Sequence, residues 1–62
     1  MVTIRFCDLA TRQTIGEYPN QYSVPSSRDT AVMVDAQLYR IMGFVWDYSI
    51  EGTLVLIWLK KE

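Results

Sequence analysis

The sequence predicts a small all-β domain in which five antiparallel strands close into a barrel. Apolar and polar residues alternate with a period of two along several segments, as they do in half-buried strands. Turn-forming residues separate these segments at short spacing. No segment combines a helical period with capping residues. A chain of 62 residues has room for one hydrophobic core, so residues 1–62 are expected to form a single domain.

The first two strands are expected to form a hairpin. In residues 2–7, Val2, Ile4 and Phe6 share one face, and residues 14–18 form a second β-type run that ends before Pro19. The polar residues between the two runs favour a turn. Residues 19–30 contain both prolines and form the one long connection. Such connections are often functional, although a strap that closes the barrel is the simpler interpretation.

The remaining residues predict three more strands. Residues 31–34 form the third strand, Asp35-Ala36-Gln37 a tight turn, and residues 38–48 a long fourth strand. Gly43 lies inside this fourth strand, where glycine often marks a bulge or a bend. Residues 49–52 form a second hairpin turn, and residues 53–61 the fifth strand.

The last hairpin is apolar on both of its faces. Pairing across residues 49–52 gives one face with Tyr48 opposite Thr53, Trp46 opposite Val55, Phe44 opposite Ile57 and Met42 opposite Leu59. The outer face then has Val45 opposite Leu56, Gly43 opposite Trp58 with space for the indole, Asp47 opposite Leu54, and Ile41 opposite Lys60. A strand that is apolar on both faces is typical of burial on both sides. A slip of one residue exchanges partners but leaves both faces apolar.

Two covers for the outer face follow from this pattern. In the first, Gly43 bends the strand so that its halves line different walls, and residues 22–25 lie over the remainder. In the second, the face packs against a second copy of the chain or against another protein. The two covers are compatible with each other.

The segment RDTAVMVDAQLYRI (residues 28–41), followed by VWDY (residues 45–48), resembles the strand-turn-strand pattern of small SH3-like barrels. This pattern is common among short phage and mobile-element proteins. The resemblance implies an SH3-like barrel and an accessory or inhibitory role, and it implies no site residues. Ala36 stands where glycine is usual. If the turn needs a positive φ, alanine is strained by roughly 1 kcal/mol, so a longer loop through Gln37 is an alternative.

The composition argues against catalysis. The chain has no histidine, which excludes an imidazole base and a histidine metal site. The single cysteine, Cys7, can form neither an internal disulfide nor a thiolate zinc site, and it favours a reducing, cytoplasmic location. The apolar run of residues 54–59 is far shorter than the roughly 20 residues that span a bilayer. We therefore expect a protein that is not an enzyme, with no cofactor, metal or membrane contact.

Nucleic-acid binding is a weaker alternative. Phosphate binding needs clustered Lys and Arg, whereas the net charge is −1. The candidate contacts are Arg5, Arg40, Lys60 and Lys61. Arg40 and Lys61 are expected side by side, with Lys60 on the opposite face and Arg5 adjacent. Solubilising charge at the sheet edge is the simpler interpretation.

The favoured function is binding of another protein, including a two-fold homodimer as one form. The expected contact residues are Ile41, Val45, Leu56 and Trp58 on the outer face, with Tyr22, Arg28 and Asp29 in the long loop. Tyr22 and Trp58 would supply anchor area, because interface hot spots favour Trp, Tyr and Arg. A structural assembly subunit and a weak nucleic-acid-binding barrel are the alternatives.

Overall fold

The computed structural model describes residues 1–25, 27–49 and 52–62. Its strands are β1 (Val2–Asp8), β2 (Thr14–Gln21), β3 (Ala31–Val34), β4 (Gln37–Ser49) and β5 (Gly52–Lys61). The predicted all-β class is confirmed, and four of the five strands agree with the predicted ranges to within one residue at each end. Within the described ranges, no helix has the length and apolar character needed to cross a membrane.

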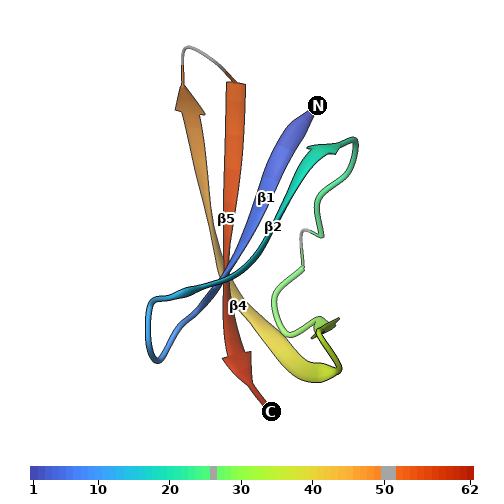
Figure 1. The fold of residues 1–62 in the computed structure, drawn as a ribbon, viewed down its shortest axis with the longest axis vertical. Helices are drawn as coiled ribbons and strands as arrows, with labels where there is room; N and C mark the ends of the chain where they lie inside the picture. The colour runs from blue at the N-terminus through green and yellow to red at the C-terminus, as the bar shows by residue number, and fades with distance from the viewer. Residues whose placement is uncertain (26, 50–51) are drawn as a thin grey trace.

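The strands form one mixed sheet in the order β2-β1-β5-β4-β3. Neighbouring strands are antiparallel except β1 and β5, which are parallel and pair from Val2 with Thr53 to Asp8 with Leu59. The prediction of a purely antiparallel sheet is therefore wrong. Strand direction is not encoded in the alternation of side chains. Two parallel neighbouring strands have to be joined by a long crossover connection. The chain from β2 to β4 provides this connection between β1 and β5 (Figure 1).

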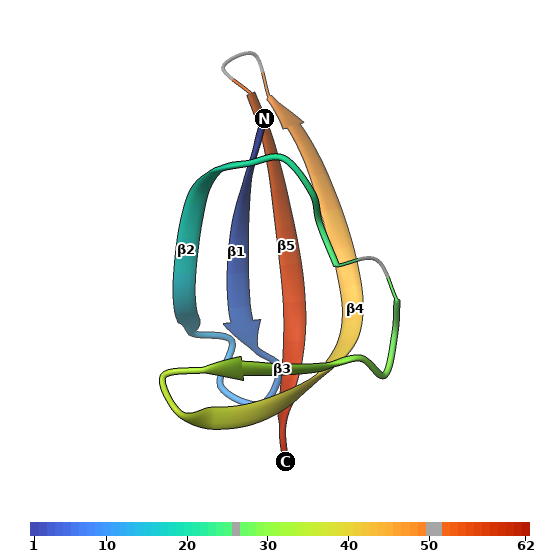
Figure 2. The ribbon, with the colours of Figure 1, turned by 90° about the vertical axis from the view of Figure 1, so that its right-hand side faces the viewer.

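The sheet coils until it is nearly closed into a barrel, with β3 and the first part of β4 crossing in front of β1 and β5 (Figure 2). The bend in β4 coincides with a register irregularity between Ile41 and Gly43. A bulge places one extra residue in the strand and turns it sharply. The predicted bend near Gly43 is thus confirmed. The edge strands β2 and β3 do not pair with each other.

The core fills the inner side of the coiled sheet. Its buried residues are Ile4, Phe6, Val34, Ile41, Val55, Ile57 and Leu59. They come from β1, β3, β4 and β5, so the core joins strands that are far apart in the sequence. Full burial of such a side chain stabilises the folded state by roughly 1.5–3 kcal/mol.

The long connection begins later than predicted, because β2 continues through Pro19 to Gln21. Pro19 is tolerated there because β2 is an edge strand. The pairing of β2 with β1 is irregular in this region, and Asn20 has a φ of 60°. The strap, residues 22–25 and 27–30, then crosses the inner side of the sheet (Figure 2), where Val24 packs against the core. Residues 22–25 therefore do not cover the outer face, and that predicted intramolecular cover is wrong.

The turn between β3 and β4 contains two residues, Asp35 and Ala36, with φ values of 50° and 64°. Val34 pairs directly with Gln37, so the alternative of a longer loop through Gln37 is wrong. Two successive positive φ values define the hairpin turn whose twist matches that of the flanking strands. The predicted tight turn is confirmed, and Ala36 occupies the conformation that glycine prefers.

Candidate functional site: the outer face of the sheet

The outer face follows the predicted pairing along most of the last hairpin. Val45 lies opposite Leu56, Gly43 opposite Trp58, and Asp47 opposite Leu54. On the far side of the bulge the predicted pairs Met42–Leu59 and Ile41–Lys60 are wrong. Leu59 instead pairs with Ile41, and Lys60 pairs with Arg40.

The bulge moves Ile41 from the outer face to the core. Ile41 is 0% exposed and packs with the buried residues of β1 and β5. It therefore cannot contribute to a surface for a partner, and its predicted role as a contact residue is wrong. One extra residue in a strand is enough for this exchange, because side chains alternate between faces with a period of two.

Strand β1 supplies a third row of side chains to this face, which the sequence did not predict. Its parallel register places Thr3 beside Leu54, Arg5 beside Leu56, and Cys7 beside Trp58. Arg5 in turn forms an ion pair with Glu17 of β2, with 2.6 Å between Nη2 and Oε1. The outer side of the sheet therefore changes from apolar on β4 and β5 to charged on β1 and β2.

We define the outer apolar face as Val45, Leu54, Leu56 and Trp58. Val45 is 47% exposed, and the other three side chains are half-buried. Cys7, next to Trp58, is buried. The face is thus a real apolar surface, smaller than predicted because Ile41 has left it.

The outer face has open space at Gly43. A Cβ atom built at Gly43 would have no heavy atom within 4 Å. The indole of Trp58 therefore does not fill the space, contrary to the prediction. Gly43 is also not among the residues with positive φ, so its backbone conformation does not require glycine.

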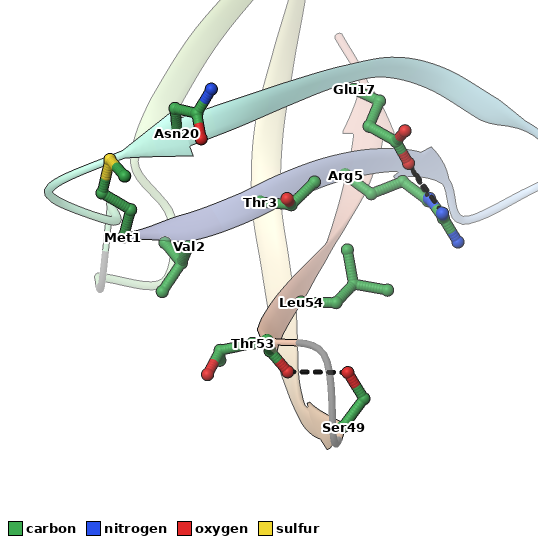
Figure 3. Close-up of a pocket in the computed structure, with 10 residues that line it drawn as sticks. Met1, Val2, Thr3, Arg5, Glu17, Asn20, Ser49, Thr53 and Leu54 are labelled. Carbon is green, nitrogen blue, oxygen red and sulfur yellow. Dashed lines mark hydrogen bonds and ion pairs between the residues drawn. The ribbon is translucent and has the colours of Figure 1, made fainter.

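An open polar groove of about 550 Å³ adjoins the outer apolar face. Figure 3 shows the ion pair of Arg5 and Glu17 at one end, Ser49 at the other, and Leu54 between them. The groove contains both charges of the ion pair, hydroxyl groups, and the apolar side chains of Met1, Val2 and Leu54. This composition suits the polar rim of a protein interface better than a pocket for a small molecule.

The loop residues do not join the outer apolar face in one surface. Tyr22 is 89% exposed, but it precedes Val24, which packs on the inner side of the sheet. Arg28 and Asp29 lie in an exposed turn beside the bulge of β4. There the amide of Asp29 donates to the carbonyl of Ile41 at 2.9 Å. The predicted combined surface is therefore divided between two sides of the molecule.

Two exposed aromatic residues lie where the sequence predicted core. Trp46 and Tyr48 are 46% and 76% exposed, and their rings stack with centroids 6.4 Å apart. They belong to the half of β4 that extends with β5 beyond the crossing strands (Figure 1). Alternation assigned their face correctly, but it could not show that this part of β4 stays uncovered although Val55, opposite Trp46, is buried in the core.

The cationic residues are arranged differently from the prediction. Arg40 faces Lys60, whereas Lys61 pairs with Tyr39, so the expected Arg40–Lys61 neighbours are wrong. Arg40 forms an ion pair with Glu62, with 2.6 Å between Nε and Oε1. Arg5 is likewise engaged by Glu17 and lies beside Leu56, several residues from Lys60 along β5. Two of the four candidate cations are thus partly neutralised by neighbouring carboxylates.

Comparisons with known protein families, with curated proteins and with solved structures find no significant match for this chain. Residues 1–25, 27–49 and 52–62 contain no cluster of three or more His, Cys, Asp or Glu side chains that could hold a metal ion. The surfaces of the fold are therefore what can indicate a function.

Proposed function

We propose that this chain is a non-enzymatic protein-binding module whose contact surface is the outer apolar face. The observation that supports this most directly is the uncovered apolar surface formed by exposed Val45 and half-buried Trp58, with open space at Gly43 between them. Small proteins gain stability from every apolar group they bury. A small domain that leaves such a face uncovered is suited to burying it against a partner.

The glycine itself argues for a partner. Glycine inside a strand costs about 0.5–1 kcal/mol relative to alanine. At Gly43 the isolated fold gains nothing in return, since a Cβ would meet no atom within 4 Å and φ is not positive. Glycine is useful at such a position when another backbone or a bulky side chain must approach closely. A partner side chain inserted beside Trp58 would meet this condition.

The composition of the surroundings fits a protein partner. The apolar centre is bordered by Asp47 on β4 and by the Arg5–Glu17 ion pair on β1 and β2. Protein interfaces combine an apolar centre with a polar rim in the same way. Nucleic acid is less well suited, because Arg5 and Arg40 are already engaged by carboxylates.

The test compares two carboxylates introduced on opposite faces of the same strand. Val45→Glu changes the outer apolar face, and Tyr48→Glu changes an exposed position on the inner side of β4. A partner cross-linked by the native chain should also be cross-linked by Tyr48→Glu, but not by Val45→Glu or Gly43→Val. Sedimentation of the native chain shows whether that partner is a second copy.

The proposal fails if Val45→Glu and Gly43→Val retain the same partner as the native chain. It also fails if the native chain stays monomeric and every captured protein is equally retained by all variants. The chain can also be tested with a labelled single strand of nucleic acid. Binding at low salt that is lost at moderate salt would favour the nucleic-acid-binding alternative over the protein-binding proposal.

An accessory or inhibitory role in a phage or mobile element is one concrete version of this proposal. It is supported by the SH3-like pattern of residues 28–41 and by the nearly closed five-stranded sheet. The parallel pair of β1 and β5 departs from the antiparallel arrangement that the resemblance implies. A cytoplasmic location belongs to the same proposal and is supported by Cys7, a buried thiol without a disulfide.

A further inference from the structure

The two edges of the sheet differ in how well they are protected. Strand β2 contains Pro19, which has no N–H to offer, and its pairing with β1 is irregular at two places. Proline and bulges discourage another strand from adding to an edge. Strand β3 has the sequence Ala-Val-Met-Val, with no charge, proline or bulge. Apart from its short length, β3 therefore has none of the protective features of β2.

The outward hydrogen-bonding groups of β3 can be assigned from the ladder. The carbonyl of Leu38 accepts a bond from the amide of Glu62 at 3.1 Å, so the backbone of Leu38 is directed toward β5. Its partner across the β3–β4 pair is Met33. In an antiparallel ladder, two residues that face each other either both direct their backbone groups toward the partner strand or both direct them away from it. Met33 therefore directs its N–H and C=O away from β4, and Ala31, two residues earlier, does the same.

A groove of about 370 Å³ lies along this edge. Its apolar lining includes Ile4, Phe6, Tyr18, Pro25, Val32 and Val34, and none of the described residues that line it is charged. Figure 2 shows β2 and the strap bordering the region above β3. The same groove thus offers unpaired backbone groups on one wall and apolar side chains on the others.

We propose that an extended peptide segment of a partner protein adds to the free edge of β3 as a further strand. Its backbone bonds to Ala31 and Met33, and its alternate side chains, apolar and uncharged, enter the groove. Peptide recognition by strand addition obtains affinity from the main chain and specificity from pockets for alternate side chains. This surface is separate from the outer apolar face, so the two proposals stand or fall independently.

Charge and shape favour a peptide over a second copy of this chain. If two copies paired through β3 about a two-fold axis at Val32, the turn that contains Asp35 in each copy would lie near the turn that contains Asp29 in the other. Bringing these like charges together disfavours that pairing, and both residues are exposed. The strap and β2 also border the groove (Figure 2), which suits one extended chain better than the edge of a folded sheet. A basic residue at the end of the peptide would complement Asp35.

The first test uses capped peptides of the form Lys-Thr-X-Thr-X-Thr-Lys, where X is Val, Leu or Phe, and amide NMR spectra of the whole chain. At least one peptide should shift the amides of Ala31 and Met33 and slow their hydrogen exchange at millimolar concentration or below. Methylation of the peptide nitrogens along one edge should weaken binding by at least about tenfold, because each lost bond is worth about 1 kcal/mol.

The second test changes the edge itself. Met33→Pro removes one outward N–H and leaves the bonds between β3 and β4 in place, so it should weaken binding by about fivefold or more. Met33→Thr changes the same side chain but keeps the N–H, and it should bind within about threefold of the native chain. If Met33→Pro does not fold, the methylated peptides decide.

Three results would overturn the proposal. The first is that none of the three peptides affects Ala31 or Met33. The second is that Met33→Pro or a methylated peptide binds as tightly as its unmodified counterpart. The third is that the amides of Ala31 and Met33 become protected as protein concentration rises without peptide, which would assign the edge to a second copy.

Discussion

Ala36 and Gly43 show that single residues can oppose the local preference of the backbone. Ala36 adopts a φ of 64°, where L side chains are strained and glycine is not. Gly43 lies in a strand without needing the freedom of glycine. The strain at Ala36 is not offset by any contact described for this turn. The cost of glycine at position 43 is offset if a partner occupies the outer face, as proposed above.

Ala36→Gly is expected to stabilise the chain. Removing the left-handed strain gains about 1–2 kcal/mol, and the greater freedom of the unfolded chain offsets about 0.4–1 kcal/mol of it. The free energy of unfolding in urea should therefore rise by roughly 0.5–1 kcal/mol. Asp35→Gly should gain less, because Asp tolerates positive φ better than Ala. A loss of stability in Ala36→Gly would contradict the two-residue turn.

Gly43→Ala is expected to leave the isolated fold unchanged or to stabilise it by up to about 1 kcal/mol, because the new methyl group meets open space and strand entropy favours alanine. Gly16→Ala is the matched control. A Cβ at Gly16 would lie 3.0 Å from the hydroxyl oxygen of Tyr18, whose ring packs edge-on against Phe6. Its urea midpoint should fall. If Gly43→Ala lowers the urea midpoint more than Gly16→Ala does, the space at Gly43 is already filled in the native fold. Gly43 would then give no support to a protein partner.

At the scale of the element, the β4–β5 hairpin shows how far alternation reaches. Alternation predicted both strands and six of the cross-strand pairs correctly, from Gly43–Trp58 to Tyr48–Thr53. Residues 50 and 51 of the predicted turn lie outside the described residues. Beyond the bulge the predicted pairs were wrong. A bulge adds one unpaired residue, and in a strand that is apolar on both faces this residue does not alter the sequence pattern. Gly43 signalled the bend, but not the direction in which the register would change. Because of this change in register, Ile41 lies in the core, while Met42 has no partner in the ladder and is exposed.

Ile41 and Val45 provide the test of this register. Ile41→Ala should lower the free energy of unfolding by about 2–5 kcal/mol, because it leaves a cavity in the core, where Ile41 is 0% exposed. Val45→Ala should cost less than about 1 kcal/mol, since Val45 is 47% exposed on the outer face. Both values can be measured by urea unfolding. Similar losses for the two variants would show that the bulge is placed wrongly and that Ile41 belongs to the outer face.

At the scale of the whole molecule, the parallel pairing of β1 with β5 decides which surfaces exist. It brings Arg5 beside Leu56 and Cys7 beside Trp58, and it leaves β2 and β3 as the two edges. The side-chain pattern predicted the strands but not their order, because contacts between distant segments depend on the crossover and not on local alternation. For the same reason the rim at Arg5 and the open edge of β3 were not predictable from the sequence.

The parallel register predicts which pairs of residues can be cross-linked. Neighbouring strands lie about 4.8 Å apart, within reach of a disulfide. Trp58→Cys should therefore form a disulfide with Cys7, its partner across the pair. In a Cys7→Ser background, Thr3→Cys with Leu54→Cys should do the same, because these positions also pair. Thiol titration and the mass of the non-reduced chain measure the outcome.

The control exchanges the partners. In the Cys7→Ser background, Thr3→Cys with Trp58→Cys should stay reduced under the same oxidant, because position 58 lies four residues along β5 from the partner of Thr3, about 13 Å away. An antiparallel arrangement of β1 and β5 centred on the same residues would give the reverse result, with the exchanged pair oxidised and both matched pairs reduced. Such a result would leave Arg5, the midpoint of the pairing, beside Leu56, but it would place Thr3 beside Trp58 and Cys7 beside Leu54. The buried thiol would then lie at the other end of the outer apolar face, and the parallel crossover from β1 to β5 would be wrong.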